Sequence, residues 1–183
     1  MKLVILDRDG VINEDSSDFI KSPAEWHPLP GSLDAIARLT RAGYAIVVAT
    51  NQSGVGRGLL DETTLRSIHD KLRNAVNKAG GRLTDIVYCP HRPDEACTCR
   101  KPQPGLFRQV AERYDVKLAG VPVIGDSARD LDAARAVGAR PILVLTGKGR
   151  ATLSTVSPTG VEVYPDLAAV ATQLVLESTG VAS

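Results

Sequence analysis

The chain has 183 residues, of which 43% are hydrophobic and 23% are charged. This composition is ordinary for a soluble globular protein, and the length allows one well-packed domain rather than two. The formal net charge of +1 argues against nucleic acid or a membrane surface as a partner, and no apolar run is long enough to cross a membrane. The apolar run near the N-terminus is too short for a signal peptide, so we expect a cytoplasmic protein. We also expect the protein to act as a monomer.

The first half of the chain alternates short apolar runs with amphipathic segments. Its predicted elements are a strand over 3–6, a loop over 13–30, a helix between 31 and 43, a strand over 45–49, a glycine-rich loop over 54–58, a helix between 61 and 81, and a strand over 85–88. A run that is apolar at every position is typical of a strand buried on both faces. The helices are predicted from apolar residues three or four positions apart and from capping and stop residues at their ends.

The second half continues the alternation. Its predicted elements are a loop over 89–104 rich in proline and cysteine, a helix from 105, a strand over 121–124, a short helix over 129–137, a strand over 141–145, a short edge strand over 161–164 and a helix from 166. Buried strands that alternate with amphipathic helices predict an α/β fold, in which helices cover both faces of a parallel sheet.

Polar residues follow four of the predicted strands, at the point where each strand ends. In chain order they are Asp7 and Asp9, Thr50 and Asn51, Cys89 and His91, and Asp126. The carboxyl ends of parallel strands meet at one edge of a sheet, where ligands bind. We therefore expect these side chains to converge on one site although they are far apart in the sequence.

The two acids after the first strand suit the hydrolysis of a phosphate ester. A carboxylate such as that of Asp7 can attack phosphorus and form an aspartyl-phosphate. Because the carboxylate and the phosphate repel each other, a divalent cation such as Mg²⁺ must neutralise both, and Asp7 and Asp126 can bind it. The alternative for residues 7–10 is an ordinary turn, since aspartate and glycine are common turn formers.

Other strand-end residues complete this chemistry. Thr50, Asn51 and Lys101 offer donors for the oxygens of the transferred phosphoryl group. Asp9 is close enough to protonate the leaving alkoxide and later to activate water. A turn explains Asp7 and Asp9 but not the matching groups at the other strand ends, so phosphate hydrolysis is the better hypothesis.

The three cysteines fall within 11 residues and share that stretch with a histidine. The pattern is Cys89-x-His91 followed by Cys97-x-Cys99. Three thiolates and an imidazole form a closed tetrahedral Zn²⁺ set, which predicts a structural zinc loop over 89–101. Arg100 and Lys101 follow directly, so zinc would order the segment that carries these two cationic side chains. The alternative is a set of free cysteines and a surface histidine.

Four motifs identify a family resemblance. They are DRDGVIN at 7–13, TNQSG at 50–54, RKP at 100–102 and GDSARD at 125–130. They resemble the four motifs of the haloacid dehalogenase superfamily of phosphatases, in order and over about two thirds of the chain. The resemblance implies one phosphatase domain over 1–183, built on a Rossmann-like parallel sheet in strand order 5-4-1-2-3 with helices on both faces and no large cap domain.

The resemblance also implies roles for single residues. Asp7 is then the nucleophile and a Mg²⁺ ligand, and Asp9 is the general acid and base with its backbone carbonyl on the metal. Thr50 and Lys101 stabilise the phosphoryl group, and Asp126 is a further Mg²⁺ ligand. Asp130 is either the second acid of the fourth motif or an exposed residue that opens a helix.

The zinc loop followed by RKP is similar to a subgroup that contains heptose-bisphosphate and histidinol-phosphate phosphatases. Residues 50–58 and 100–106 favour the heptose enzymes, whereas 16–20 is nearer to the histidinol-phosphate enzymes, and Ser127 stands where the heptose enzymes often have lysine. A phosphorylated sugar is the expected substrate, and histidinol phosphate is the alternative. The implied substrate contacts are Asp7, Arg8, Asp9, Asp15, Ser16, Ser17, Asp18, Thr50, Asn51, Gln52, Ser53, Arg100 and Lys101.

Recognition of a bisphosphate requires a second cationic patch, for which Arg57, Arg92 and Arg100 are candidates. Two other functions are open to this sequence. A phosphorelay receiver also uses strand-end aspartates and Mg²⁺, but its phosphoacceptor usually follows the third strand, where this chain has Cys89. A zinc-loop binding module would need a basic helix or an aromatic platform, which the loop lacks.

Overall fold

The apolar run that opens the chain lies in the middle of a parallel sheet. The computed structural model describes residues 1–157 and 159–180. The strands are β1 (Lys2–Leu6), β2 (Tyr44–Asn51), β3 (Asp85–Cys89), β4 (Pro122–Gly125), β5 (Arg140–Val144) and β6 (Glu162–Tyr164). Their order across the sheet is β3-β2-β1-β4-β5-β6, and every neighbouring pair is parallel. The predicted order is confirmed, and β6 extends the sheet at the β5 edge.

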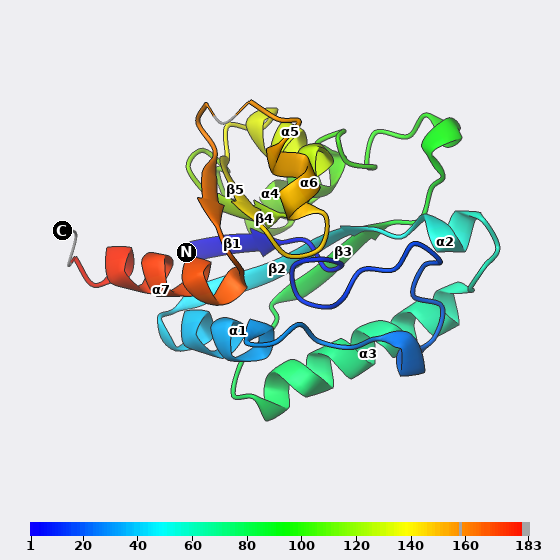
Figure 1. Ribbon diagram of the computed structural model, residues 1–183, viewed down its shortest axis with the longest axis horizontal. Helices are drawn as coiled ribbons and strands as arrows, with labels where there is room; N and C mark the ends of the chain where they lie inside the picture. The colour runs from blue at the N-terminus through cyan, green and yellow to red at the C-terminus, as the bar shows by residue number, and fades with distance from the viewer. Residues whose placement is uncertain (158, 181–183) are drawn as a thin grey trace.

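Helices cover both faces of this sheet (Figure 1). They are η1 (Pro23–Glu25), α1 (Ser32–Arg41), α2 (Ser53–Gly56), α3 (Glu62–Lys78), η2 (Pro93–Glu95), α4 (Gly105–Tyr114), α5 (Ala128–Arg135), α6 (Gly149–Leu153) and α7 (Leu167–Ser178). None of the helices within the described residues is long and apolar enough to span a bilayer.

Alternate side chains of β1 belong to two separate cores. Val4 and Leu6 join the core under α1, α3 and α7, whereas Leu3 and Ile5 join the core under α4 and α5. Successive side chains of a strand point to opposite faces, so a run that is apolar throughout can fill both cores at once. The interpretation of 3–6 as a doubly buried strand is confirmed.

The polar residues after the second apolar run belong to the strand itself. We expected this strand to end at 49, but β2 continues through Thr50 and Asn51, which pair with Tyr88 and Cys89 of β3. The ladder bonds are made by the backbone and do not depend on the side chain. Four short helices, η1, α2, η2 and α6, also lie in segments that we expected to be irregular.

The loop before α1 is fastened to α3 by one lysine. Lys71 Nζ donates hydrogen bonds to the carbonyl oxygens of Pro23 (2.6 Å) and Trp26 (2.8 Å) and lies over the Trp26 ring. The Trp26 side chain is itself buried in the core. This attachment holds the loop beside the carboxyl end of the sheet, where the polar strand ends lie.

Candidate active site

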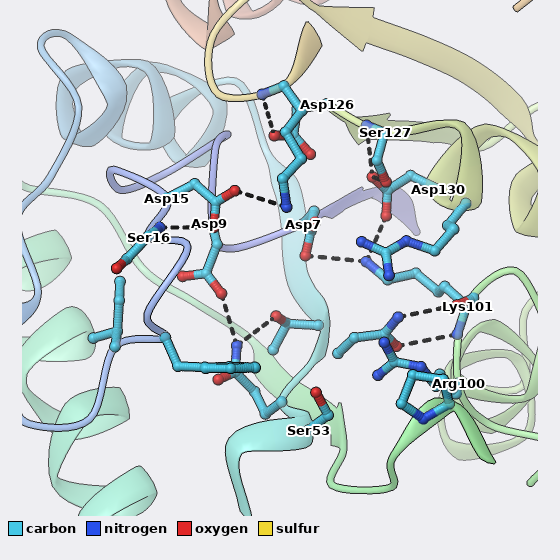
Figure 2. A pocket seen from close by; sticks show the side chains of 18 of the residues that line it. Asp7, Asp9, Asp15, Ser16, Ser53, Arg100, Lys101, Asp126, Ser127 and Asp130 are labelled. Carbon is cyan, nitrogen blue, oxygen red and sulfur yellow. Dashed lines mark hydrogen bonds and ion pairs between the residues drawn. The ribbon is translucent and has the colours of Figure 1, made fainter. Parts of the chain in front are cut away.

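The polar strand ends surround a cavity of about 330 Å³ at the carboxyl edge of the sheet. Figure 2 shows the side chains that converge on it from β1, β2, β4 and the loop before α4. The lining residues are Asp7, Asp9, Asp15, Ser16, Ser17, Phe19, Ile20, Thr50, Asn51, Gln52, Ser53, Arg57, Pro93, Arg100, Lys101, Asp126, Ser127, Arg129, Asp130 and Lys148. The convergence expected from the strand order is therefore confirmed for Asp7, Asp9, Thr50, Asn51 and Asp126, whereas Cys89 and His91 do not line this cavity.

A buried lysine binds two of the carboxylates. Lys101 Nζ lies 3.0 Å from Asp7 Oδ1 and 2.6 Å from Asp130 Oδ1, and it also donates to the carbonyl oxygen of Ala49 at 2.8 Å. The lysine is 2% exposed and Asp130 is 1% exposed. The sequence allowed Asp130 to be either a site acid or an exposed helix residue, and the burial of its side chain excludes the exposed alternative.

Three carboxylates of this cavity are arranged as a cation site. Oxygens of Asp7, Asp126 and Asp130 all lie within 4.8 Å of one another. Lys101 supplies one positive charge against three carboxylates, which leaves room for a divalent ion, and carboxylate oxygens are hard ligands that suit Mg²⁺. The residues therefore fit the predicted ion. We expected the carboxylates of Asp7 and Asp126 together with the backbone carbonyl of Asp9, and Asp130 adds a third carboxylate to that set.

Asp126 is held by close approach of two glycines. A Cβ atom at Gly10, which has φ +81°, would lie 2.0 Å from Asp126 Oδ2, and one at Gly147 would lie 2.2 Å from the same oxygen. The backbone N–H of Lys148 donates to that oxygen at 2.8 Å. Only residues without a side chain can bring two loops this close to the carboxylate.

Burial and mutual repulsion shift the acid–base properties of the cluster. Burial raises the pKa of Asp7 to about 7, against the pull of Lys101 and with the help of Asp130 and Asp126. Burial also raises the pKa of Asp126 to about 6. Burial opposes ionisation of Asp130 as well, but Lys101 outweighs it and holds the pKa of Asp130 below its ordinary value. A cation would relieve the charge that remains on Asp7 and Asp126.

Asp9 lies apart from this cluster, in a cradle of donors. Its Oδ1 accepts from Arg8 Nε (3.0 Å) and Asn13 Nδ2 (2.8 Å), and its Oδ2 accepts from Arg8 Nη2 (3.1 Å) and Gln52 Nε2 (2.9 Å). All four acceptor positions of the ionised carboxylate are thus occupied. One donor must withdraw when Asp9 takes up a proton.

The rim of the cavity is basic. Arg57, Arg100, Arg129 and Lys148 line it, and Lys148 Nζ forms an ion pair with Asp15 at 3.0 Å. We did not predict Arg129 or Lys148. Lys148 follows β5, so the rule that strand-end residues converge would have found it had we applied it to the fifth strand. Arg129 lies inside the fourth motif, in which we singled out only the acids Asp126 and Asp130.

Three predicted contacts lie elsewhere. The Arg8 side chain is buried and points to Asp9 rather than into the cavity. Asp18 is exposed and is not among the residues that line the cavity. Arg92, a candidate for the second cationic patch, instead forms an ion pair with Asp94 at 3.0 Å.

The cysteine loop forms a second, separate ligand cluster. Cys89 Sγ lies 3.1 Å from Cys99 Sγ and 3.6 Å from Cys97 Sγ, and His91 Nδ1 lies 3.3 Å from Cys99 Sγ. Four ligands at about 2.1–2.3 Å from a tetrahedral zinc ion are separated by about 3.4–3.8 Å. The measured distances reach or fall slightly short of that spacing, and the three thiols and one imidazole match a zinc ligand set. Within the part of the chain that the structure describes, this is the one group of cysteines.

One side chain connects the cysteine loop to the cavity. Asn51 Oδ1 accepts from the backbone N–H of Lys101 at 3.1 Å, and Asn51 Nδ2 donates to the Lys101 carbonyl oxygen at 3.0 Å. The amide thus holds the backbone of the residue whose ammonium group binds Asp7 and Asp130. We had expected Asn51 to contact the phosphate instead.

Comparisons with known proteins agree with this geometry. A family model described as HAD-hydrolase-like matches residues 98–170. The chain is 59% identical over 179 residues to the D-glycero-beta-D-manno-heptose-1,7-bisphosphate 7-phosphatase of Bordetella bronchiseptica, covering 97% of this chain and 100% of the relative. It is 55% identical over 175 residues to the enzyme of the same name from Pseudomonas putida, covering 96% and 100%.

Solved structures give the same result. The crystal structure of D,D-heptose 1,7-bisphosphate phosphatase from B. bronchiseptica, complexed with magnesium and phosphate, has a TM-score of 0.95 and 59% identity, with 97% of this chain and 99% of that chain covered. The corresponding enzyme from Burkholderia thailandensis has a TM-score of 0.76 and 48% identity, with coverage of 95% and 98%.

Proposed function

Because the chain belongs to the family of D-glycero-beta-D-manno-heptose-1,7-bisphosphate 7-phosphatases, within the HAD-like hydrolases, we propose that it removes the 7-phosphate of that sugar. The product would serve the synthesis of nucleotide-activated heptose for the lipopolysaccharide core. The observation that carries the chemistry is the cluster of Asp7, Asp126 and Asp130, in which one buried lysine, Lys101, binds Asp7 and Asp130.

Asp7 is the proposed nucleophile. Its Oδ1 accepts hydrogen bonds from the Arg8 N–H (2.7 Å) and from Lys101 Nζ (3.0 Å), so its Oδ2 is the oxygen available to attack phosphorus. Mg²⁺ bound by Asp7, Asp126 and Asp130 would offset the repulsion between this carboxylate and the phosphate. Lys101 and Thr50 line the same cavity and stabilise the oxygens of the transferred group.

The proton moves through Asp9. As Asp7 forms its bond to phosphorus, the bond from phosphorus to the C7 oxygen breaks, and Asp9 donates a proton to that oxygen. Asp9 then takes a proton from water as the water attacks the aspartyl-phosphate, which releases phosphate and restores the Asp7 carboxylate. Gln52 and Asn13 hold Asp9 between these steps.

The basic rim is the proposed site for the second phosphate. Arg57 and Arg129 are exposed and Arg100 is half-buried, and all three line the cavity that contains Asp7. Guanidinium groups suit phosphate because they offer paired donors in one plane. The rim therefore favours a substrate with two phosphates over histidinol phosphate, which has one.

The experiment compares the two substrates. We expect kcat/KM for heptose 1,7-bisphosphate to exceed that for histidinol phosphate by at least about a hundredfold, and we expect Arg129→Ala to reduce the difference without changing kcat for p-nitrophenyl phosphate. Phosphate release in the presence of Mg²⁺ is the measurement. Comparable turnover of histidinol phosphate would refute the sugar assignment while leaving the phosphatase chemistry in place.

We also propose that the chain acts as one domain over 1–183, as a monomer, in the cytoplasm, and without nucleic acid or membrane as a partner. One continuous sheet with a core on each face supports the single domain. Light scattering after size-exclusion chromatography tests the oligomeric state, and a mass of two chains would overturn it.

A further inference from the structure

A buried histidine lies behind the active site, on a helix that contributes no residue to the cavity. His69 of α3 is 7% exposed, and its Nε2 lies 3.3 Å from Arg8 Nη1. It belongs to none of the four motifs, and the ring packs edge-on against Tyr88. The proposed chemistry assigns this side chain no role.

Arg8 connects this histidine to the carboxyl group that moves the proton. Its Nε and Nη2 bind the two oxygens of Asp9, and its Nη2 also donates to Gln52 Oε1 at 3.1 Å. The guanidinium group has no exposed surface, so each of its N–H groups needs a partner inside the protein. His69 is the partner of Nη1, the nitrogen of Arg8 that does not bind Asp9, whereas Gln52 binds both Arg8 and Asp9.

The chemistry of arginine determines the state of the histidine. A guanidinium group only donates, so His69 Nε2 must accept and the proton of the neutral ring must lie on Nδ1. Burial first, and then the charge of Arg8, lowers the pKa of His69 to about 3. The ring is therefore a neutral acceptor throughout the physiological range, and Arg8 is held from both ends.

We propose that His69 is a positioning residue for Asp9, acting through Arg8. A rigid guanidinium plane fixes the plane of the carboxyl group that it binds at two points, and a small misplacement of a proton donor reduces the rate of proton transfer. This inference rests on the proposed function, because it assumes that Asp9 transfers the proton to and from the leaving oxygen.

The test uses leaving groups that need a proton to different extents. An alkoxide, as in heptose 1,7-bisphosphate or glycerol 3-phosphate, leaves poorly without a proton, whereas p-nitrophenolate leaves well without one. We expect His69→Leu to lower kcat/KM by about ten- to a hundredfold for the alkyl esters and by less than about threefold for p-nitrophenyl phosphate. His69→Gln can still present an acceptor to Arg8 and should recover most of the loss.

A matched variant separates positioning from general damage to the helix. Val76→Ala removes buried apolar atoms about two turns further along α3 than His69, and it should change both kinds of ester equally. Thermal unfolding shows whether each variant is folded, and ¹⁵N spectra of the ring should show the Nδ1–H tautomer. Equal losses for both leaving groups in His69→Leu and His69→Gln would overturn the inference.

A failure of the substrate assignment can be distinguished from a failure of the inference about His69. If the wild-type protein does not hydrolyse heptose 1,7-bisphosphate, the proposed substrate is wrong, but glycerol 3-phosphate still supplies the alkyl ester for the comparison. If Asp9→Asn loses no more activity on alkyl esters than on p-nitrophenyl phosphate, the assumed role of Asp9 is wrong. Only the leaving-group dependence of the His69 variants decides the positioning role.

Discussion

The acidic centre, formed by Asp7, Asp126, Asp130 and Lys101, and the cysteine loop, residues 89–101, which ends at that lysine, are built in opposite ways. The cysteine loop takes all four of its ligands from 11 consecutive residues. The acidic centre takes its members from three segments between residues 7 and 130. The first can be recognised from spacing alone, whereas the second depends on how the strands are aligned.

Strand register is what assembles the acidic centre. β1 pairs with β4 so that Leu6 lies opposite Ile124, and the N–H of Asp7 donates to the carbonyl oxygen of Ile124 at 2.9 Å. This alignment places Asp7 and Asp126 at the same level of the sheet edge. A shift in register would separate the two carboxylates, whereas it would leave the spacing of the cysteines unchanged.

The two regions also differ in what they contribute. The acidic centre concentrates like charges that favour a cation, and we propose that one of its carboxylates, that of Asp7, reacts with the phosphate. Four protein ligands would leave a zinc ion in the cysteine loop no free position, so we expect the loop to contribute order, which reaches the acidic centre through Lys101 and Asn51. Changes in the acidic centre should therefore remove the chemistry, and changes in the cysteine loop should weaken it.

The largest effect should come from Asp7→Asn. We expect kcat to fall at least about a thousandfold, because an amide cannot form the aspartyl-phosphate, while the fold is retained. Mg²⁺-dependent phosphate release from p-nitrophenyl phosphate measures it. Asp115→Asn makes the same change at an exposed position that already has a left-handed backbone, and it should retain full activity. Full turnover by Asp7→Asn would exclude Asp7 as the nucleophile.

Loss of a cysteine should have a smaller effect on rate and a larger one on stability. We expect Cys99→Ser to bind less than one zinc ion per chain, to unfold at a lower temperature and to lose about ten- to a hundredfold in kcat/KM. Elemental analysis, thermal unfolding and kinetics measure these three quantities. Thr98→Ser, a change at the exposed neighbour, is the control. Wild-type protein that contains no zinc when prepared without chelator would contradict the zinc assignment.

Asn51→Ala breaks the connection between the two regions. If the amide aligns Lys101, kcat/KM should fall about tenfold for every phosphate ester, including p-nitrophenyl phosphate. A loss confined to the heptose substrate would show instead that Asn51 contacts the sugar, as the sequence had suggested. Asn74→Ala, at an exposed position on α3, should have no effect.

The smallest expected effect is the dependence of the free energy of unfolding on pH. Burial raises the pKa values of Asp7 and Asp126 to about 7 and about 6, above the ordinary 3.8, so the folded chain binds more protons than the unfolded chain between about pH 4 and 7. Without Mg²⁺, the contribution of these groups to the free energy of unfolding should fall as pH rises through that range.

Added Mg²⁺ should replace those protons, so its stabilising effect should be several-fold larger at pH 8 than at pH 5. Denaturant unfolding in magnesium-free buffer, with and without the ion, measures this difference. In the double variant Asp7→Asn, Asp126→Asn both the pH dependence and the response to Mg²⁺ should become small. A wild-type response to Mg²⁺ that is the same at both pH values would contradict the raised pKa values.

Sequence patterns predicted most of the sheet because buried parallel strands need apolar side chains at every position, and 3–6 and 141–145 show this plainly. They were less informative at polar positions. Asp130 at the first turn of α5 suits a helix cap as well as a site acid, and the structure uses it for both, since it accepts from Ser127 and binds Lys101. Only burial distinguishes such an acid from an exposed one.

By itself, the sequence determined the classes of group that this protein brings to its chemistry: an aspartate pair after a buried strand, a lysine after a metal loop, and the four ligands of that loop. These are local patterns, and local spacing specifies them. The tertiary structure decided which groups meet. It directed Arg8 away from the cavity to Asp9, placed His69 behind Arg8, and added Lys148 to the rim, because packing and strand register act over distances in sequence that no local pattern records.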